Sequence, residues 1–566
     1  TKPRTVFRWR ANTTAPTPMD LDASQITQLG SASILNYLRG DGSNEGTSAG
    51  QFRVRPDGKL GDIVNSGPVY VGKPQQGYFD SMESSRYSAF VSARANRTPM
   101  VYVGANDGML HAFNAATGVE AFAYVPSMAY SKLQQLKNPG YAHEFFVDGS
   151  PKVADAFIGG AWKTLLVGGL NAGGQGIYAL DVTDPSTVDE SSASSRVLWE
   201  FTDRQTAASG SPSAVMNYDE DLGFTFGAPS IVKSRAGWVA IFGNGYNNVA
   251  ADGAASASGN AVLYVVELAT GKLLKKFDTG RGFAQSASGT APNGLSSPAA
   301  VDVDGNGVVD FVYAGDLQGN LWKFDLSSSS MSNWAIAYGG APLFTAKTAS
   351  NVPQPITSEP NVARHPRGGY FVYFGTGKSL EYGDNANALQ NSFYAIWDHG
   401  AAVTTGRNKL LQQTVIEEVT ASGEAWRLVS NNIPTWTGAS PNTGWYIDLP
   451  TSLERQITNS VLRGGRIIFV TAIPEAAICK AGGTSWLMGL NAQTGGYLDQ
   501  TPFDVNADGQ FSNADFLIRS SGGDAHPVGG EKLSGLVSEP EMLDNNARGA
   551  EVGIIKGSKG DPEKVE

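Results

Sequence analysis

Pairs of short apolar segments, joined within each pair by a glycine-containing turn, recur along this chain of 566 residues. The segments are rich in β-branched and aromatic residues and are bounded by Gly, Asn and Asp, a pattern typical of β-strands. This recurrence restricts the fold to a repeated β architecture, because each pair is one unit that must bury its apolar face against neighbouring units. The pairs are 101–104 with 110–113, 165–168 with 177–180, 239–243 with 263–266, 311–315 with 321–324, 371–375 with 393–396, and 467–470 with 486–490.

A second recurring feature is a proline that follows Ser, Gly or Ala within two residues. We expect it at the entry of a strand, where no ladder hydrogen bond is lost. The first five of these prolines lie 83, 78, 69 and 62 residues apart, which indicates one repeat unit with inserted loops in each interval. The prolines are Pro68, Pro151, Pro229, Pro298, Pro360 and Pro540.

These repeats predict an all-β chain that folds as a β-propeller with long inserted loops. Six repeat units can be identified in the sequence, each expected to form one blade. A seventh blade is expected if residues 552–556 close a sheet built partly by the N-terminal region. An array of β-sandwiches is the alternative, but it does not explain the repeated second segment. We predict a single propeller domain over 1–566, with an entry segment 1–60 and units starting near 68, 151, 229, 298, 360, 440 and 540.

Regions outside the repeats predict little regular structure. The likeliest short helices span 26–39 and 128–137, and the Gly-, Ala- and Ser-rich insertions 250–259 and 327–330 read as mobile surface loops. Arg39-Gly40-Asp41 is a tripeptide of the integrin-binding type at the end of the first predicted helix, where Gly is an ordinary C-cap.

Composition excludes several classes of function. The chain has 42 basic and 53 acidic residues, a net charge of −11, which argues against non-specific nucleic-acid binding. No apolar run is long enough to cross a membrane. The one cysteine, Cys479, excludes an internal disulfide and any multi-thiolate metal site. The start at Thr1 lacks both Met and an apolar leader, which suggests a processed or excised segment.

The stretch 302–310 has the spacing of a calcium-binding loop. Calcium prefers six to eight hard oxygen ligands at ~2.4 Å, and oxygens at loop positions 1, 3, 5, 7 and 9 of a short acidic loop supply them. Position 7 contributes only its backbone carbonyl, as in EF-hand loops. The predicted ligands are Asp302, Asp304, Asn306, Val308 and Asp310. An acidic solvated turn is the alternative interpretation.

A second stretch, 504–515, follows the twelve-residue EF-hand register, with Gly509 at position 6 and Asp in place of the usual final Glu. An Asx-rich surface loop is again the alternative. The candidate ligands here are Asp504, Asn506, Asp508, Gln510, Ser512 and Asp515.

Several motifs resemble the C-terminal domain of the type IV pilus PilY/PilC tip proteins: GDIVNSGP at 61–68, FVDGSP at 146–151, FGNGYN at 242–247 and YAGDLQGNLWKFD at 313–325. The resemblance covers nearly the whole chain. It implies a modified seven-bladed propeller whose calcium loop matches Asp302, Asp304, Asn306, Val308 and Asp310. It also implies a place at the surface, pilus tip or outer membrane of a Gram-negative bacterium.

The same resemblance implies a non-enzymatic, calcium-binding regulator of pilus biogenesis, extension and retraction, twitching motility and surface adhesion. Its expected partners are pilins or minor pilins. Contact with host or abiotic surfaces is expected through an N-terminal adhesive region that this segment lacks.

Two further classes of function fit a propeller. Segment 107–118 resembles the repeats of quinone-dependent alcohol dehydrogenases, but these typically use an adjacent cysteine pair, which a single cysteine excludes. A calcium-independent assembly scaffold is the other alternative. No Ser-His-Asp pattern appears, and the scattered histidines read as structural: His111, His143, His365, His399 and His526.

Overall fold

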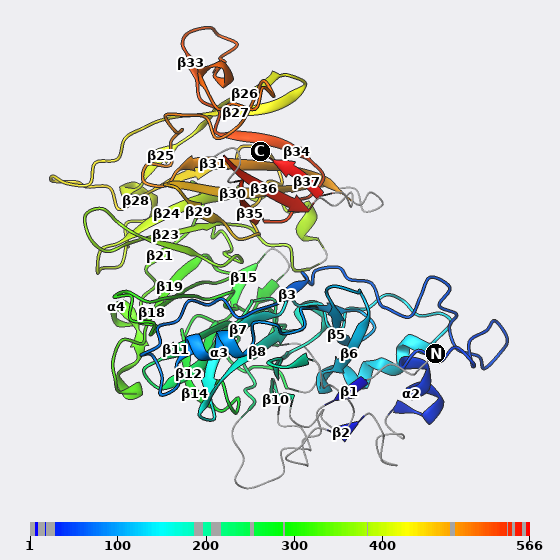
Figure 1. The fold of residues 1–566 in the computed structure, drawn as a ribbon. Coiled ribbons are helices and arrows are strands. Elements are labelled where there is room, and N and C mark those ends of the chain that lie inside the picture. Colours follow the sequence, from blue (N-terminus) through cyan, green and yellow to red (C-terminus); the bar gives the residue numbers. More distant parts are fainter. Residues whose placement is uncertain are drawn as a thin grey trace. The chain divides into compact units, whose positions relative to one another are not determined.

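The computed structural model describes residues 29–185, 196–204, 217–249, 254–286, 289–381, 383–475 and 482–539, together with the backbone of a few short strands nearer the ends. Most of the regular structure is antiparallel β (Figure 1). The chain divides into two compact units: Thr1–Val312 with Asp325–Ala335, and Tyr313–Phe324 with Ile336–Glu566.

The first unit is built from sheets whose strands mostly follow one another along the chain. Their orders are β2-β1-β6-β5-β4-β3, β10-β9-β8-β7 and β11-β12-β13-β14, with a small β15-β16 pair. The strands are β1 (Val6–Arg8), β2 (Thr17–Pro18), β3 (Val69–Val71), β4 (Met100–Ala105), β5 (Met109–Asn114), β6 (Glu120–Val125), β7 (Lys152–Ile158), β8 (Ala161–Gly169), β9 (Gly176–Asp181), β10 (Val197–Thr202), β11 (Ser230–Ser234), β12 (Gly237–Gly243), β13 (Val262–Glu267), β14 (Leu273–Asp278), β15 (Ala284–Ser286), β16 (Gly289–Ala291) and β17 (Ala299–Val301).

The chain passes into the second unit within β18, and that unit repeats the same kind of sheet in the orders β22-β23-β24-β28-β25, β26-β27-β34-β31-β30-β29 and β35-β36-β37. Its strands are β18 (Phe311–Gly315), β19 (Asn320–Asp325), β20 (Ala335–Ile336), β21 (Phe344–Thr345), β22 (Asn361–Arg364), β23 (Tyr370–Gly375), β24 (Ser392–Asp398), β25 (Leu411–Gln413), β26 (Val415–Ala421), β27 (Glu424–Val429), β28 (Gly444–Asp448), β29 (Val461–Arg463), β30 (Arg466–Pro474), β31 (Gly483–Asn491), β32 (Leu517–Ile518), β33 (Ala525–His526), β34 (Gly530–Ser534), β35 (Glu541–Asn545), β36 (Ala550–Lys556) and β37 (Pro562–Val565).

The predicted strand pairs are confirmed. All twelve predicted segments lie in strands, and the two members of each pair are neighbours in one sheet, as in β4 with β5 and β30 with β31. Five of the predicted prolines directly precede a strand at the edge of a sheet, namely β3, β7, β11, β17 and β22. Pro540 lies outside the described residues.

Two details of the predicted repeat differ from the structure. The N-terminal β1 pairs with β6 and β2, whereas β36 pairs with β35 and β37, so among the described strands residues 552–556 share no sheet with the N-terminal region. Pairing between strands close in sequence closes shorter loops and so costs less chain entropy. In addition, β28 pairs with β24, so the residues near 440 complete one sheet and do not open the next.

Helical structure is sparse, as predicted. Within the first predicted helix, α2 covers Ala32–Leu38, and Ser31 caps its N-terminus by accepting a bond from the Ile34 amide; residues 26–28 lie outside the described residues. The second predicted helix, over 128–137, is a 3₁₀ helix in the structure. Helix α3 was not predicted from the sequence. The described helices are α2 (Ala32–Leu38), α3 (Tyr87–Ala93), α4 (Ala337–Gly340), and the 3₁₀ segments η1 (Ser127–Lys137), η2 (Asn171–Gly173), η5 (Met331–Asn333), η6 (Asp384–Ala386), η7 (Gly406–Lys409) and η8 (Asn513–Asp515).

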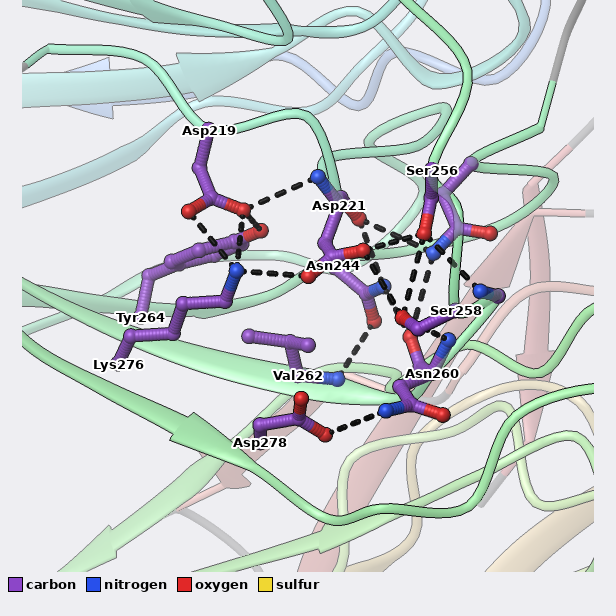
Figure 2. A network of polar contacts seen from close by, with 12 residues as sticks. Asp219, Asp221, Asn244, Ser256, Ser258, Asn260, Val262, Tyr264, Lys276 and Asp278 are labelled. Atoms are coloured by element: carbon purple, nitrogen blue, oxygen red, sulfur yellow. Dashed lines mark hydrogen bonds and ion pairs between the residues drawn. The ribbon is translucent and has the colours of Figure 1, made fainter.

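The insertion at 250–259, predicted to be mobile, is anchored at its end. Ser256 is buried, and its hydroxyl and that of Ser258 both donate to Asp221 (Figure 2). Lys276 donates to the same carboxylate over 2.6 Å and to Asp219 over 2.7 Å. Burial raises the pKa of Asp221, but the bonds from Lys276 and Ser256 outweigh it and hold that pKa below its ordinary value. The serines of this insertion therefore donate hydrogen bonds to a buried carboxylate, in addition to favouring a loop conformation.

A cluster of aromatic rings surrounds His365 in the second unit. The imidazole stacks on Trp397 with a centroid separation of 4.1 Å and lies 4.5 Å from Phe371 and 4.9 Å from Trp436. Its Nδ1 accepts a bond from the Arg367 amide, so the neutral ring carries its proton on Nε2. Burial lowers the pKa of His365 to about 4.

This lowered pKa predicts acid sensitivity. Between about pH 6.5 and pH 4 the unfolded chain binds a proton at this histidine that the folded protein does not bind, so stability falls as the pH falls. The expected loss from this residue is about 3 kcal/mol at most. In His365→Asn, which keeps an acceptor for the Arg367 amide but does not titrate, denaturant unfolding at pH 7.5 and 4.5 should show a smaller difference. Equal differences in both proteins would contradict this account.

Candidate metal centre

The predicted loop 302–310 lies in the first unit, after β17 and before β18, the strand within which the chain passes into the second unit. Its ends are held together by the Asp310 amide, which donates to the Val301 carbonyl over 2.9 Å. Gly305 and Gly307 have φ of +76° and +82°, values that other residues rarely adopt. A Cβ atom at position 307 would also lie 3.0 Å from Cε of Met82. Glycine at these two positions therefore lets the loop turn tightly and pack closely.

Three carboxylates of this loop converge. One oxygen from each of Asp302, Asp304 and Asp310 lies within 4.8 Å of the other two. Asp302 and Asp304 are exposed, while Asp310 is buried. Oxygens on opposite sides of a calcium ion lie ~5 Å apart, because each Ca–O distance is ~2.4 Å. The spacing of the carboxylates therefore fits one calcium coordination shell, and the all-oxygen donor set suits a hard cation.

Backbone amides shape the loop around these side chains. Asp302 accepts from the amides of Gly305 over 2.8 Å and Gly307 over 2.6 Å, and Asp304 accepts from the Asn306 amide over 3.1 Å. Asn306 directs its side-chain nitrogen to Asp304 over 2.9 Å and accepts from the Val308 amide over 2.8 Å. The structure thus places all five predicted ligand residues in one small loop and gathers the three carboxylates.

One residue beside the loop was missed by the sequence prediction. Nη2 of Arg235 lies 2.6 Å from Oδ1 of Asp310 and forms an ion pair with it. The other oxygen of Asp310 accepts from the Val303 amide over 2.9 Å. Arg235 precedes Asp310 by 75 residues and belongs to a different repeat unit, so no local spacing could have indicated it.

The second predicted loop is organised differently. Asp515 is fully buried and accepts from the amides of Val505 over 3.0 Å and Ser512 over 2.9 Å. Asp504 accepts from the Gly509 amide over 2.7 Å, and Asp508 from the Gln510 amide over 2.8 Å. Among the residues that the structure describes, Asp302, Asp304 and Asp310 are the one group of three or more His, Cys, Asp or Glu side chains close enough to share a metal. Metal binding at 504–515, with Asn506 among its candidate ligands, stays a prediction from spacing.

The remaining sequence candidates show no metal geometry. Within the described residues, no histidine joins a group of three ligand side chains. His111 is fully buried between Glu120 (2.6 Å) and Asp107 (2.9 Å), and His143 contacts Asp62 over 2.7 Å.

Three other predictions can be placed on the structure. Gly40 of the Arg39-Gly40-Asp41 tripeptide donates to the Tyr37 carbonyl over 2.9 Å at the end of α2, as expected of a C-cap. Cys479 lies outside the described residues. No described helix has the length and apolarity needed to cross a membrane.

Repeated antiparallel sheets, five of them with a proline directly before an edge strand, define a β-propeller protein. A family model described as the PilY1 beta-propeller domain matches residues 60–424, more than half of the chain. The crystal structure of the Pseudomonas aeruginosa PilY1 C-terminal domain is similar to this structure, with a TM-score of 0.71 and 33% identity over 88% of this chain and 99% of that one. The chain belongs to the PilY1 β-propeller family.

Two curated relatives are longer proteins. A type IV pilus biogenesis factor PilY1 homologue of Xylella fastidiosa is 39% identical over 87% of this chain and 33% of its own length. The type IV pilus biogenesis factor PilY1 of Pseudomonas aeruginosa strain PAK is 36% identical over 91% of this chain and 45% of its own length. The chain thus spans less than half the length of these relatives.

Proposed function

We propose that this domain binds calcium in the loop 302–310 and acts as a non-enzymatic regulator of type IV pilus biogenesis. The observation that carries the proposal is the convergence of Asp302, Asp304 and Asp310 within 4.8 Å. The relatives named as pilus biogenesis factors support the biological setting. When bound, calcium supplies a divalent charge that offsets the repulsion among the three carboxylates.

The loop is well placed to act as a regulator because it joins two strands directly. Asp302 follows β17 and Asp310 precedes β18, so the loop conformation sets the connection between neighbouring strands. Without a cation, three carboxylates at this spacing repel one another and loosen the connection. We propose that the calcium-bound loop permits pilus extension and the empty loop permits retraction, with twitching motility as the outcome.

The proposed location is the bacterial surface, at the pilus tip or the outer membrane, and the proposed partners are pilins or minor pilins. A calcium-independent scaffold and a quinone-dependent dehydrogenase are the competing functions. The absorbance spectrum of the purified protein distinguishes the dehydrogenase, because a bound quinone absorbs at longer wavelengths than the aromatic side chains do. The scaffold is distinguished by its function, which would not depend on calcium.

The cellular test uses Asp304→Asn in the full-length protein in its own bacterium. We expect fewer surface pili and a smaller twitching zone than in the wild type, at equal protein abundance. Asp508→Asn, which makes the same charge change in the second acidic loop, is the matched control and should leave pili unchanged. An Asp304→Asn strain that has lost calcium binding but keeps normal pili and motility would refute the regulatory role.

A further inference from the structure

Arg235 stands at the tip of the hairpin formed by β11 and β12, and the hairpin holds its backbone in place. Ser234 pairs with Gly237 across the turn. The Ser234 hydroxyl donates to the Gly237 carbonyl over 2.9 Å and accepts from the Ala236 amide over 3.1 Å. The turn therefore presents the Arg235 side chain from a well-defined position.

The same hairpin is fastened to the acidic loop at two points. The Val309 amide donates to the Lys233 carbonyl over 2.8 Å, and the Arg235 guanidinium contacts Asp310 over 2.6 Å. The Asp310 side chain is only 7% exposed and that of Arg235 29%, so solvent screens this ion pair less than an ordinary surface pair. The cation is thus held against the most buried carboxylate of the loop.

The neighbouring lysine is engaged elsewhere. Nζ of Lys233 lies 2.7 Å from Oε1 of Glu83 and donates to the Met82 carbonyl over 2.7 Å. Glu83 also accepts from the Trp238 indole over 2.8 Å. Among the described ion pairs, Arg235 is therefore the cation that contacts the carboxylates of the loop 302–310.

We propose that Arg235 is a built-in counter-cation that lowers the calcium affinity of this loop and stabilises the loop when calcium is absent. This inference rests on the proposed calcium binding. In the calcium-free protein the guanidinium offsets part of the repulsion among Asp302, Asp304 and Asp310. A divalent cation bound to the same carboxylates is repelled by the guanidinium, so both effects favour the calcium-free state. The domain would then respond to a higher calcium concentration than the acidic loop alone requires.

The test measures calcium affinity by calorimetry on chelator-treated protein, with Arg235→Gln as the main variant. We expect Arg235→Gln to bind calcium about tenfold more tightly than the wild type, because one close positive charge is removed. We also expect it to melt at a lower temperature in chelator and to gain more in melting temperature from calcium. Arg235→Met, which keeps part of the aliphatic stem, should show the same tightening if one variant folds poorly.

Two controls separate the local ion pair from net charge. Arg235→Lys keeps the positive charge and should bind calcium nearly as the wild type does. Lys272→Gln removes one exposed positive charge elsewhere in the first unit and should change affinity less than about twofold, because solvent and salt screen distant charges.

The outcomes separate this inference from the proposed function. If the wild type binds calcium and Arg235→Gln binds it equally or more weakly, the counter-cation role is wrong while calcium binding stands. If neither protein binds calcium, the proposed function fails and the inference fails with it.

Discussion

Replacing Glu454 with alanine is expected to lower the free energy of unfolding by about 3–5 kcal/mol. Arg427 and Glu454 form a two-bond ion pair, with Nη1–Oε1 at 2.6 Å and Nη2–Oε2 at 2.9 Å, and both side chains are fully buried. The guanidinium also lies 4.0 Å from the ring of Trp486, and the Thr471 hydroxyl donates to Glu454 over 2.7 Å. Removing the carboxylate leaves a buried positive charge whose remaining carboxylate partner, Glu418 at 3.0 Å, is exposed to solvent and cannot replace the buried pair.

The ion pair joins parts of the second unit that are distant in sequence. Arg427 lies in β27, and Glu454 lies in the segment between β28 and β29. Glu424, at the exposed start of β27, is the matched control, and Glu424→Ala should change stability by less than about 0.5 kcal/mol. Denaturant unfolding followed by tryptophan fluorescence provides the measurement. A Glu454→Ala protein as stable as Glu424→Ala would show that the pair contributes nothing.

Substitution of Asp304 with asparagine is expected to weaken calcium binding on the order of a hundredfold. Calcium affinity depends strongly on the number of charged ligands, and this change removes one of three carboxylates without altering side-chain size. The bonds that Asp304 accepts in the loop come from Asn306 alone, and an amide oxygen can still accept one of them. Asp302, in contrast, holds the Gly305 and Gly307 amides, so its replacement would also disturb the loop backbone.

The measurement for Asp304→Asn is the rise in melting temperature when calcium is added to chelator-treated protein. The wild type should gain stability in proportion to the logarithm of calcium concentration above its dissociation constant, and the variant should gain little over the same range. Asp508→Asn is again the control, since it changes charge equally at the second acidic loop. Equal calcium-dependent gains in wild type and Asp304→Asn would exclude Asp304 as a ligand.

Much of the fold could be predicted from sequence because each strand pair is local. A hairpin is defined by two apolar runs and a turn close together in the chain, so its signal lies within one short window. The prolines before β3, β7, β11, β17 and β22 added a second local signal at each strand entry. The strand pairs and the proline positions in the structure both follow these signals.

The long-range pairings were harder to predict. Strand β1 joins β6 in parallel across more than one hundred residues, and β27 of an inserted hairpin pairs with β34. Neither pairing has a local signature, because the two strands of each pair lie about one hundred residues apart in the sequence. For the predicted blade shared by residues 552–556 and the N-terminal region, the described strands show β36 paired with β35 and β37 instead.

The candidate site divides in the same way. The convergence of Asp302, Asp304 and Asp310 follows from the spacing of one contiguous loop, which sequence shows directly. Arg235 reaches Asp310 only through the packing of a hairpin from another sequence repeat of the same compact unit. In the second loop, spacing alone was not sufficient to predict the geometry. The spacing resembles an EF-hand, but in the structure Asp515 is buried and accepts bonds from loop amides. Spacing identifies candidate ligands, whereas packing determines which other charges surround them.

The central claim is that the loop 302–310 binds calcium, and a calorimetric titration of calcium into chelator-treated wild-type protein tests it most directly. We predict a saturable site that is strongly weakened in Asp304→Asn, which leaves the backbone bonds of Asp302 intact, and retained in Asp508→Ala. If the second acidic loop also binds, a separate site will disappear in Asp508→Ala. A wild-type protein that shows no saturable calcium binding would contradict the claim and leave a calcium-independent propeller scaffold.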